Sequence, residues 1–231
     1  MYSKTHFSKA ALHALIASSA IVTLLFATFF LAEPTVSRGQ SDTATFYIRQ
    51  QITGESSFLV NPSNINMVGS IAGVTGGQAT GTTQFVVTSN NSSGYYVDIA
   101  FFDNGTEQAM LGESTASESL RDYTGSTTEP SRGYVASTSA QFAYTVTSST
   151  TADTDASFFH DGSTCNAGGL QTVTCWMTPT TSAFRIVDRT TSAVSGATST
   201  LTFNVTVPSG ANPVPVADFY TATATLSLYD K

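Results

Sequence analysis

Charged residues are scarce in this sequence, and their scarcity limits the partners that the surface can attract. Asp, Glu, Lys and Arg make up 11% of the 231 residues, and the formal net charge is −7. Lysine occurs only at Lys4, Lys9 and Lys231. A protein that binds nucleic acid neutralises phosphates with clustered cations. We therefore expect no nucleic-acid partner.

Cysteine is nearly absent, and the two that occur, Cys165 and Cys175, are too few for a four-ligand zinc site. The nine residues between them include Gly168 and Gly169. This spacing fits a loop or hairpin closed by a disulfide in an oxidising compartment. We expect the two cysteines to be bonded, which on a loop-closure argument stabilises the fold by about 2 to 3 kcal/mol.

Recognisable catalytic motifs are also missing. His160 is the only histidine that follows the N-terminal apolar run, and no serine lies in a G-x-S-x-G elbow. No two carboxylates share a predicted strand face at a spacing that would aim both into one cleft. A hydrolase built around His160 is a competing hypothesis. We expect a protein that is not an enzyme and has no cofactor.

What the sequence does contain is one long apolar run, from Ala10 to Ala32, preceded by Lys4 and Lys9. As a helix it would be about 35 Å long, enough to span a hydrocarbon core of about 30 Å. The basic side should stay in the cytoplasm, so the rest of the chain is predicted to be exported. The run exceeds the apolar region of a typical signal peptide, which favours an uncleaved anchor facing outside. Cleavage near residues 35–37, giving a secreted protein, is the alternative.

A third interpretation of the N-terminus rests on Lys9, Ala10, Ala11 and Leu12. This short stretch resembles the recognition sequence that precedes the hydrophobic helix of type IV pilin-like proteins. Most such pilins carry a glutamate near the start of that helix, whereas the first acidic residue here is Glu33. A pilin-like subunit stays an alternative to the anchor.

Alternation of apolar and polar residues with a period of two recurs after the apolar run. Leu201, Phe203 and Val205 alternate with Thr202 and Asn204, as the two faces of a half-buried strand require. Comparable patterns predict strands over 44–52, 58–60, 65–71, 83–89, 95–102, 140–148, 183–188, 198–207 and 220–229. The domain organisation predicted is a helix over 1–32, a tether over 33–43 and a β domain over 44–231.

Many short strands separated by turn residues, with no amphipathic helical stripe between them, predict an all-β fold. We expect an antiparallel β-sandwich, immunoglobulin-like or jelly-roll, preceded by the single apolar helix. Serine and threonine are abundant, and threonine suits the wet face of a strand. Residues 112–132 are polar and lack strand periodicity, so they are predicted to form a long surface loop.

Two groups of residues are candidate binding sites. Asp153, Asp155 and Asp161 lie close in sequence and are candidate ligands for Ca²⁺, which takes about six to eight oxygens. Their spacing does not complete an EF-hand loop, so a turn-forming acidic loop is the competing interpretation.

The second group is aromatic. Trp176, the only tryptophan, with Tyr95 and Tyr96, is a candidate platform for stacking on sugars, and packing over the disulfide is the alternative for Trp176.

The two closing strands carry a family resemblance. Residues 201–207 (LTFNVTV), a proline-containing turn and residues 220–226 (YTATATL) resemble the final hairpin of exported bacterial surface β-sandwiches. Spore-coat-U-like, WxL-like and pilus-subunit domains share such an ending. The Trp-x-Leu signature of the WxL group is missing, because Met177 and Thr178 follow Trp176. The resemblance implies a surface location and a sandwich fold.

These observations predict a non-enzymatic structural or adhesive protein of the cell surface, held in the membrane through the helix from Ala10 to Ala32. A more specific version of this hypothesis is that the chain is the subunit of a self-assembling surface filament. Its strand 44–52 would pair with the open sheet edge of a second copy. The alternative is a carbohydrate-binding module, in which surface glycans are the partners.

Overall fold

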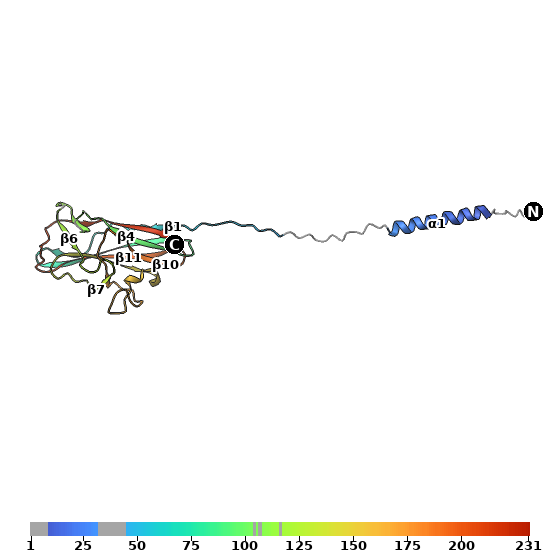
Figure 1. Ribbon diagram of the computed structural model, residues 1–231. Helices are drawn as coiled ribbons and strands as arrows, with labels where there is room; N and C mark the ends of the chain where they lie inside the picture. Colours follow the sequence, from blue (N-terminus) through green and yellow to red (C-terminus); the bar gives the residue numbers. More distant parts are fainter. Residues whose placement is uncertain (1–8, 32–44, 104, 106–107, 116) are drawn as a thin grey trace, which may run out of the picture. The chain divides into compact units, whose positions relative to one another are not determined.

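The computed structural model describes residues 9–31, 45–103, 105, 108–115 and 117–231 (Figure 1). They belong to two units, Met1–Gln51 and Ile52–Lys231. The tether predicted over 33–43 lies outside the described residues, as do Lys4, Ala32 and Ala44. The strands and the core described below all belong to the second unit.

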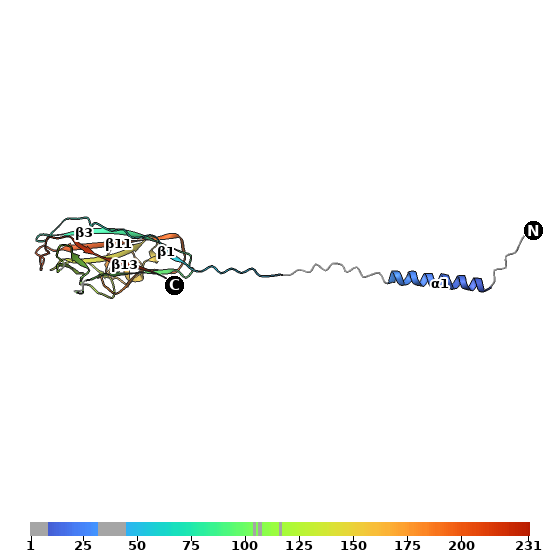
Figure 2. The same ribbon diagram turned by 90° about the horizontal axis from the view of Figure 1, so that it is seen from above.

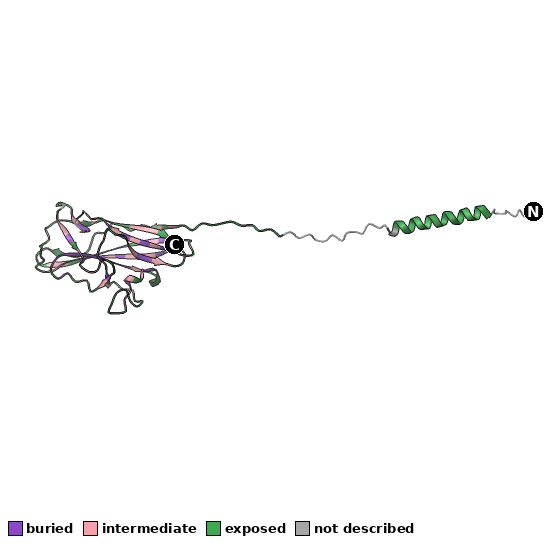
Figure 3. Ribbon diagram, viewed as in Figure 1, coloured by how far each residue is buried: buried purple, intermediate pink, exposed green. Residues whose placement is uncertain are grey.

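The first unit contains helix α1 (Lys9–Leu31). Its stretch Lys9–Phe29 has a mean hydropathy of 2.0 and is long and apolar enough to cross a membrane. The hydroxyls of Ser18, Ser19 and Thr23 donate hydrogen bonds to carbonyls three or four residues earlier. Such bonds satisfy polar side chains inside an apolar helix. The described side chains of α1 are exposed along its length (Figure 3).

The second unit is built from strands, which agrees with the predicted all-β class. Their bounds are β1 (Ser56–Val60), β2 (Ile71–Ala72), β3 (Gly76–Ser89), β4 (Tyr95–Phe101), β5 (Met110–Gly112), β6 (Ser119–Asp122), β7 (Ser131–Arg132), β8 (Gln141–Ser148), β9 (Cys175–Trp176), β10 (Phe184–Arg189), β11 (Ala193–Val207), β12 (Tyr220–Ala222) and β13 (Ala224–Asp230). Two short 3₁₀ turns, η1 (Thr151–Asp153) and η2 (Ala156–Phe158), follow β8.

The strands form one large sheet and two smaller ones. The large sheet has the order β1-β3-β11-β8-β6-β5-β12, with β2 added to β3, and the second sheet has the order β10-β4-β13. Strands β7 and β9 form the third. All pairings are antiparallel except β6 with β8. Only Thr223 separates β12 from β13, so the chain passes directly from one edge of the large sheet into the second sheet.

The centre of the large sheet is β11, which is paired with β3 on one side and β8 on the other. Figure 2 shows β3 and β11 running side by side. Leu201, Phe203, Val205 and Val207 of β11 are buried in the core. From β4 in the second sheet, Phe101 packs its ring against Phe142 and Tyr144 of β8 and against Phe203. The two sheets therefore share one hydrophobic core.

The two ends of the β domain's chain meet at one end of that core. Ser56 at the start of β1 pairs with Ser89 at the end of β3, and its hydroxyl contacts the carboxylate of Asp230. Lys231 is held by backbone and side-chain bonds to Gly94 and Asn91. Gly94 has φ +85°, and a Cβ there would lie 2.1 Å from the carbonyl oxygen of Arg189. Only glycine fits this turn between β3 and β4.

Most predicted strands form, but three predictions need correction. Residues 45–52 form no strand, because no neighbouring strand of their own chain pairs with them in the described structure. The predicted loop 112–132 contains β6 and β7, and Leu120 of β6 is buried in the core. The predicted strand 65–71 is reduced to an isolated bridge at Val68 and the first residue of β2.

We expect Phe142→Ala to destabilise the β domain by about 3 to 5 kcal/mol, because its ring contacts both Phe101 and Phe203 and its removal leaves a cavity. Urea unfolding of the full chain in detergent, followed by circular dichroism, measures the change. Val194→Ala is the control, since Val194 is 70% exposed and its truncation should shift stability by less than about 0.5 kcal/mol. Equal effects of the two substitutions would contradict the proposed core.

Candidate functional site

The aromatic side chains proposed for sugar stacking already pack against other side chains of the β domain. Tyr95 and Trp176 are buried, and the indole of Trp176 packs on Tyr134 with ring centroids 5.5 Å apart. The ring of Tyr96 is stacked on Tyr229 at 4.9 Å. The guanidinium of Arg185 lies 3.8 Å from the centroid of the Tyr96 ring. The stacking prediction was therefore wrong for Tyr95 and Trp176, and the ring of Tyr96 already has a cation and an aromatic partner.

The three aspartates proposed as Ca²⁺ ligands are not gathered around one point. Asp153 is buried and forms a salt bridge with Arg189. Asp155 accepts a hydrogen bond from the backbone N–H of Ser157, at the start of η2. Asp161 is exposed, and its carboxylate accepts hydrogen bonds from the N–H groups of Thr164 and Ser163, which lower its pKa to about 2. No cluster of three or more metal-binding side chains occurs among the described residues.

The expected disulfide between Cys165 and Cys175 is present, and His160 organises the loop that it closes. The backbone N–H of Gly162 donates to Nδ1 of His160 at 3.0 Å. Nδ1 is therefore the accepting nitrogen, and Nε2, 2.8 Å from the hydroxyl of Thr172, carries the ring proton. The imidazole is buried, and both of its nitrogens form hydrogen bonds within the loop.

A cavity of about 340 Å³ is formed where β4, β6 and the chain after β9 come together. Two carboxylates, Asp103 and Asp122, line it beside the ring of Phe102, which is 63% exposed. The remaining lining residues are Phe101, Ala109, Thr127, Thr178, Pro179, Thr180 and Thr181. The cavity thus combines acidic groups, hydroxyls and one exposed aromatic ring, which suits a small polyhydroxylated ligand.

Backbone and side-chain bonds fix the two carboxylates in place. Oδ1 of Asp122 accepts the N–H of Ala109 at 2.9 Å, and the N–H of Asp122 donates to Gln108 at 2.8 Å. Oδ1 of Asp103 accepts the N–H of Gly105 at 2.8 Å. Burial raises the pKa of Asp122 to about 7, the Ala109 N–H opposes this rise, and the negative charge of Asp103 adds to it. Asp122 therefore changes its charge near neutral pH.

Sequence reasoning missed this site. Asp122 falls in the stretch that was predicted to be a loop, and Asp103 follows the end of a strand. Three segments far apart in the sequence supply the lining, so strand periodicity alone contains no signal that they meet. The expectation from the sequence concerned carboxylates that share one strand face, and it did not cover Asp103 and Asp122, because Asp103 lies outside the strands.

A second feature is the exposed segment that precedes the β domain, residues 45–52, which we call the linker segment. Its large apolar side chains are open to solvent, with exposed fractions of 77% for Phe46, 94% for Tyr47, 89% for Ile48 and 83% for Ile52. Phe46, Ile48 and Ile52 share one face of an extended chain. Isolated apolar side chains on a surface are common, whereas contiguous exposed apolar surface is a feature of many interaction sites.

Comparison with known proteins assigns no function to either feature. The sequence matches no family model, and it matches no curated protein. The interpretation therefore rests on the geometry described above.

The raised pKa of Asp122 predicts a pH dependence of stability. Because its folded pKa of about 7 exceeds the value near 3.9 expected in the unfolded chain, the folded state binds more protons between these values. Stability should therefore fall as the pH rises from about 4 to about 7, by on the order of 1 to 2 kcal/mol after solvent screening. Asp122→Asn should remove this contribution.

The measurement is urea unfolding of wild type and Asp122→Asn at pH 4.5 and pH 7.5. Other carboxylates, such as Asp161 with its lowered pKa, contribute with the opposite sign to both proteins. The difference between the two proteins isolates Asp122. An identical pH dependence in both would contradict the assigned shift.

Proposed function

We propose that this chain is a non-enzymatic structural protein of the cell surface that assembles with copies of itself. The observation that carries the proposal is the linker segment. Phe46, Tyr47 and Ile48 are largely exposed. The segment has the alternation of a strand, yet it pairs with no strand among the described residues. An extended apolar segment of this kind is stabilised when it pairs with a sheet edge.

The proposed location outside the cell is supported by two features. Helix α1 is long and apolar enough to anchor the chain in a membrane or to direct its export. The bond between Cys165 and Cys175 is typical of oxidising compartments. With the basic residues before the helix, these features favour a β domain presented on the outer side of the membrane.

We also propose that the domain is a β-sandwich of the type found in bacterial surface proteins. The contacts of Phe101 in the second sheet with Phe142 and Phe203 in the large sheet support face-to-face packing of the two sheets. The direct passage from β12 to β13 gives the large sheet a curled edge. The resemblance of the closing strands to spore-coat-U-like and pilus-subunit domains stays a prediction from the sequence.

Replacing two apolar residues of the linker segment should prevent assembly. We expect Phe46→Ser/Ile48→Ser to shift the full chain from multimers to monomers, because about tenfold in association constant is lost for each large side chain no longer buried. Light scattering in detergent and electron microscopy of expressing cells measure the change. Gln50→Ser/Gln51→Ser is the matched control in the same segment. Unchanged multimers in the apolar variant, or monomers only in the wild type, would refute the proposal.

A second candidate function, binding of a surface saccharide, is favoured by the cavity at Asp103 and Asp122. Carboxylates, threonine hydroxyls and an exposed phenyl ring are the groups that bind sugar hydroxyls and stack on sugar rings.

Binding to a glycan array is the direct test of this candidate. Phe102→Ala and Asp103→Asn should each reduce the signal by about tenfold, because each removes one contact worth more than about 1 kcal/mol. Leu170→Ala is the control, since Leu170 is an exposed apolar side chain outside the cavity. No signal above background for the wild type would eliminate this candidate.

A further inference from the structure

Building on the proposed self-assembly, we propose that the linker segment of one copy docks on an apolar surface at the opposite end of the β domain of the next copy. We call this the far-end surface and define it by Ile71, Val74, Val214, Val216 and Phe219. The partner is thus a second copy of this chain, and the contact is head-to-tail.

The far-end surface is made by two loops that hold each other. The N–H of Gly210 donates to the carbonyl of Val74 at 3.0 Å, and Gly73 lies against Pro215 so closely that a Cβ would be 2.8 Å from its carbonyl oxygen. The apolar side chains nevertheless point into solvent, with exposed fractions of 68% for Val74, 51% for Val214, 48% for Val216 and 78% for Phe219. Apolar side chains grouped on adjacent loops mark an interaction surface.

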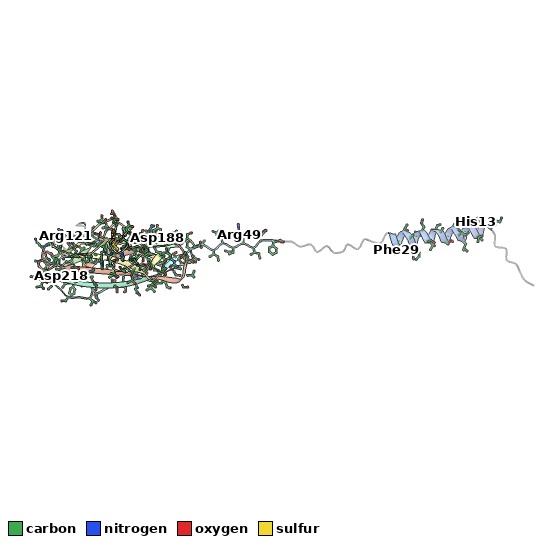
Figure 4. All side chains as sticks on the ribbon, turned by 90° about the horizontal axis from the view of Figure 1, so that it is seen from below. His13, Phe29, Arg49, Arg121, Asp188 and Asp218 are labelled. Carbon is green, nitrogen blue, oxygen red and sulfur yellow. A yellow bond between two sulfur atoms is a disulfide. The ribbon has the colours of Figure 1, made fainter. Side chains whose placement is uncertain are left out.

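Strand β3 separates this surface from the place where the chain enters the domain. Gly76 begins β3 beside the far-end loops, and Ser89 ends it opposite Ser56. At about 3.3 Å per residue, its 14 residues cover about 45 Å. Figure 1 places the start of β1 and the C-terminus at one end of the domain, and Figure 4 places Asp218 at the other.

Ile48 cannot reach the part of the far-end surface that lies beside the start of β3 in its own chain. Ile48 lies eight residues before Ser56, and a fully extended chain covers at most about 3.5 Å per residue, or about 28 Å. The length of β3 is about 45 Å. Docking of Ile48 beside Val74 therefore requires a second molecule.

The charges of the two surfaces are complementary. Arg49 is the one charged residue of the linker segment. The N–H of Glu113 donates to the carbonyl of Phe219, and Glu118 and Asp218 lie close to Tyr220. Figure 4 labels Asp218 and the cation Arg121 of β6 at this end of the domain. Asp218 is held in place because its carboxylate accepts the N–H groups of Ser114 and Thr115. The far end therefore carries a net negative charge that attracts Arg49.

Unpaired strand edges at the far end give the linker segment a way to bind. Strand β2 is hydrogen-bonded only to β3, and β12 only to β5, within the described part of the chain. An extended segment can add to such an edge through its backbone while alternate side chains enter apolar contacts. Phe46, Ile48 and Ile52 would then bury their shared face against the valines and Phe219.

A contact between two different surfaces repeats from copy to copy and makes an open row rather than a closed dimer.

Thiol cross-linking of differently tagged full-length chains tests the assignment. Ile48→Cys and Val214→Cys variants are mixed in mild detergent and treated with a short bismaleimide, which leaves the native disulfide intact. We expect a cross-linked species that contains both tags. In the control mixture, Ile48→Cys is combined with Leu59→Cys, which places the thiol on exposed β1 at the end of the domain where the chain enters. That mixture should give at least about tenfold less product.

Each outcome separates this inference from the proposed function. Cross-linking to Leu59→Cys instead of Val214→Cys, or equal yields at both, overturns the far-end assignment while self-assembly stands. A wild type that is monomeric by light scattering overturns both. A further variant, Val74→Ser in the Val214→Cys chain, should lower the yield by about tenfold through the lost apolar contact. Val194→Ser, at an equally exposed valine of β11, should leave it unchanged.

Discussion

The pairing of β11 with its two neighbours is the constraint on which the other features depend. Twelve residues of β11 are in register with β3 and eight with β8. A register shift of one residue would turn Leu201, Phe203 and Val205 out of the core. It would also remove Phe203 from the ring contacts that join the large sheet to Phe101 of the second sheet. Both the sheet order and the packing of the two sheets therefore follow from this one strand.

The same long ladder determines where the candidate sites lie. Because β3 extends from Gly76 to Ser89 in one piece, the residues before it and the residues after it are placed at opposite ends of the domain. The β4 strand then returns toward the far end, where Phe101 and Phe102 reach the cavity with Asp122. The positions of the far-end surface and of the acidic cavity are thus determined by the lengths of β3 and β4 and not by a local sequence motif.

The strands that were predictable from sequence are those in which apolar and polar residues alternate without interruption. Residues 201–207 and 95–101 are examples, because one face of each strand is buried in the core and the alternation records this face in the sequence. Strand β6 could not be predicted in this way, because its buried Leu120 lies in a polar stretch without alternation. It is a strand because it pairs with β5 and β8. The burial of Tyr95, Trp176 and Asp122 depends on contacts between segments that are far apart in the sequence. Composition and spacing carry no information about such contacts. Residues 45–52 show the converse, since their pattern is that of a strand but they pair with no strand in the described part of the chain.

The low charge of the chain gives exposed apolar groups a larger influence on contacts with other molecules than they would have on a highly charged surface. Hydroxyl-rich strand faces neither attract nor repel another copy over distances beyond a hydrogen bond, whereas dense like charges would keep copies apart. The net charge of −7 is spread over 231 residues, and at physiological ionic strength charges more than about 8 Å apart are screened. In the proposed assembly, contact between copies would then be decided by short-range terms, chiefly burial of apolar area and pairing of strand edges. A surface of this composition permits association, and the proposal places the contact at Phe46, Ile48 and Phe219.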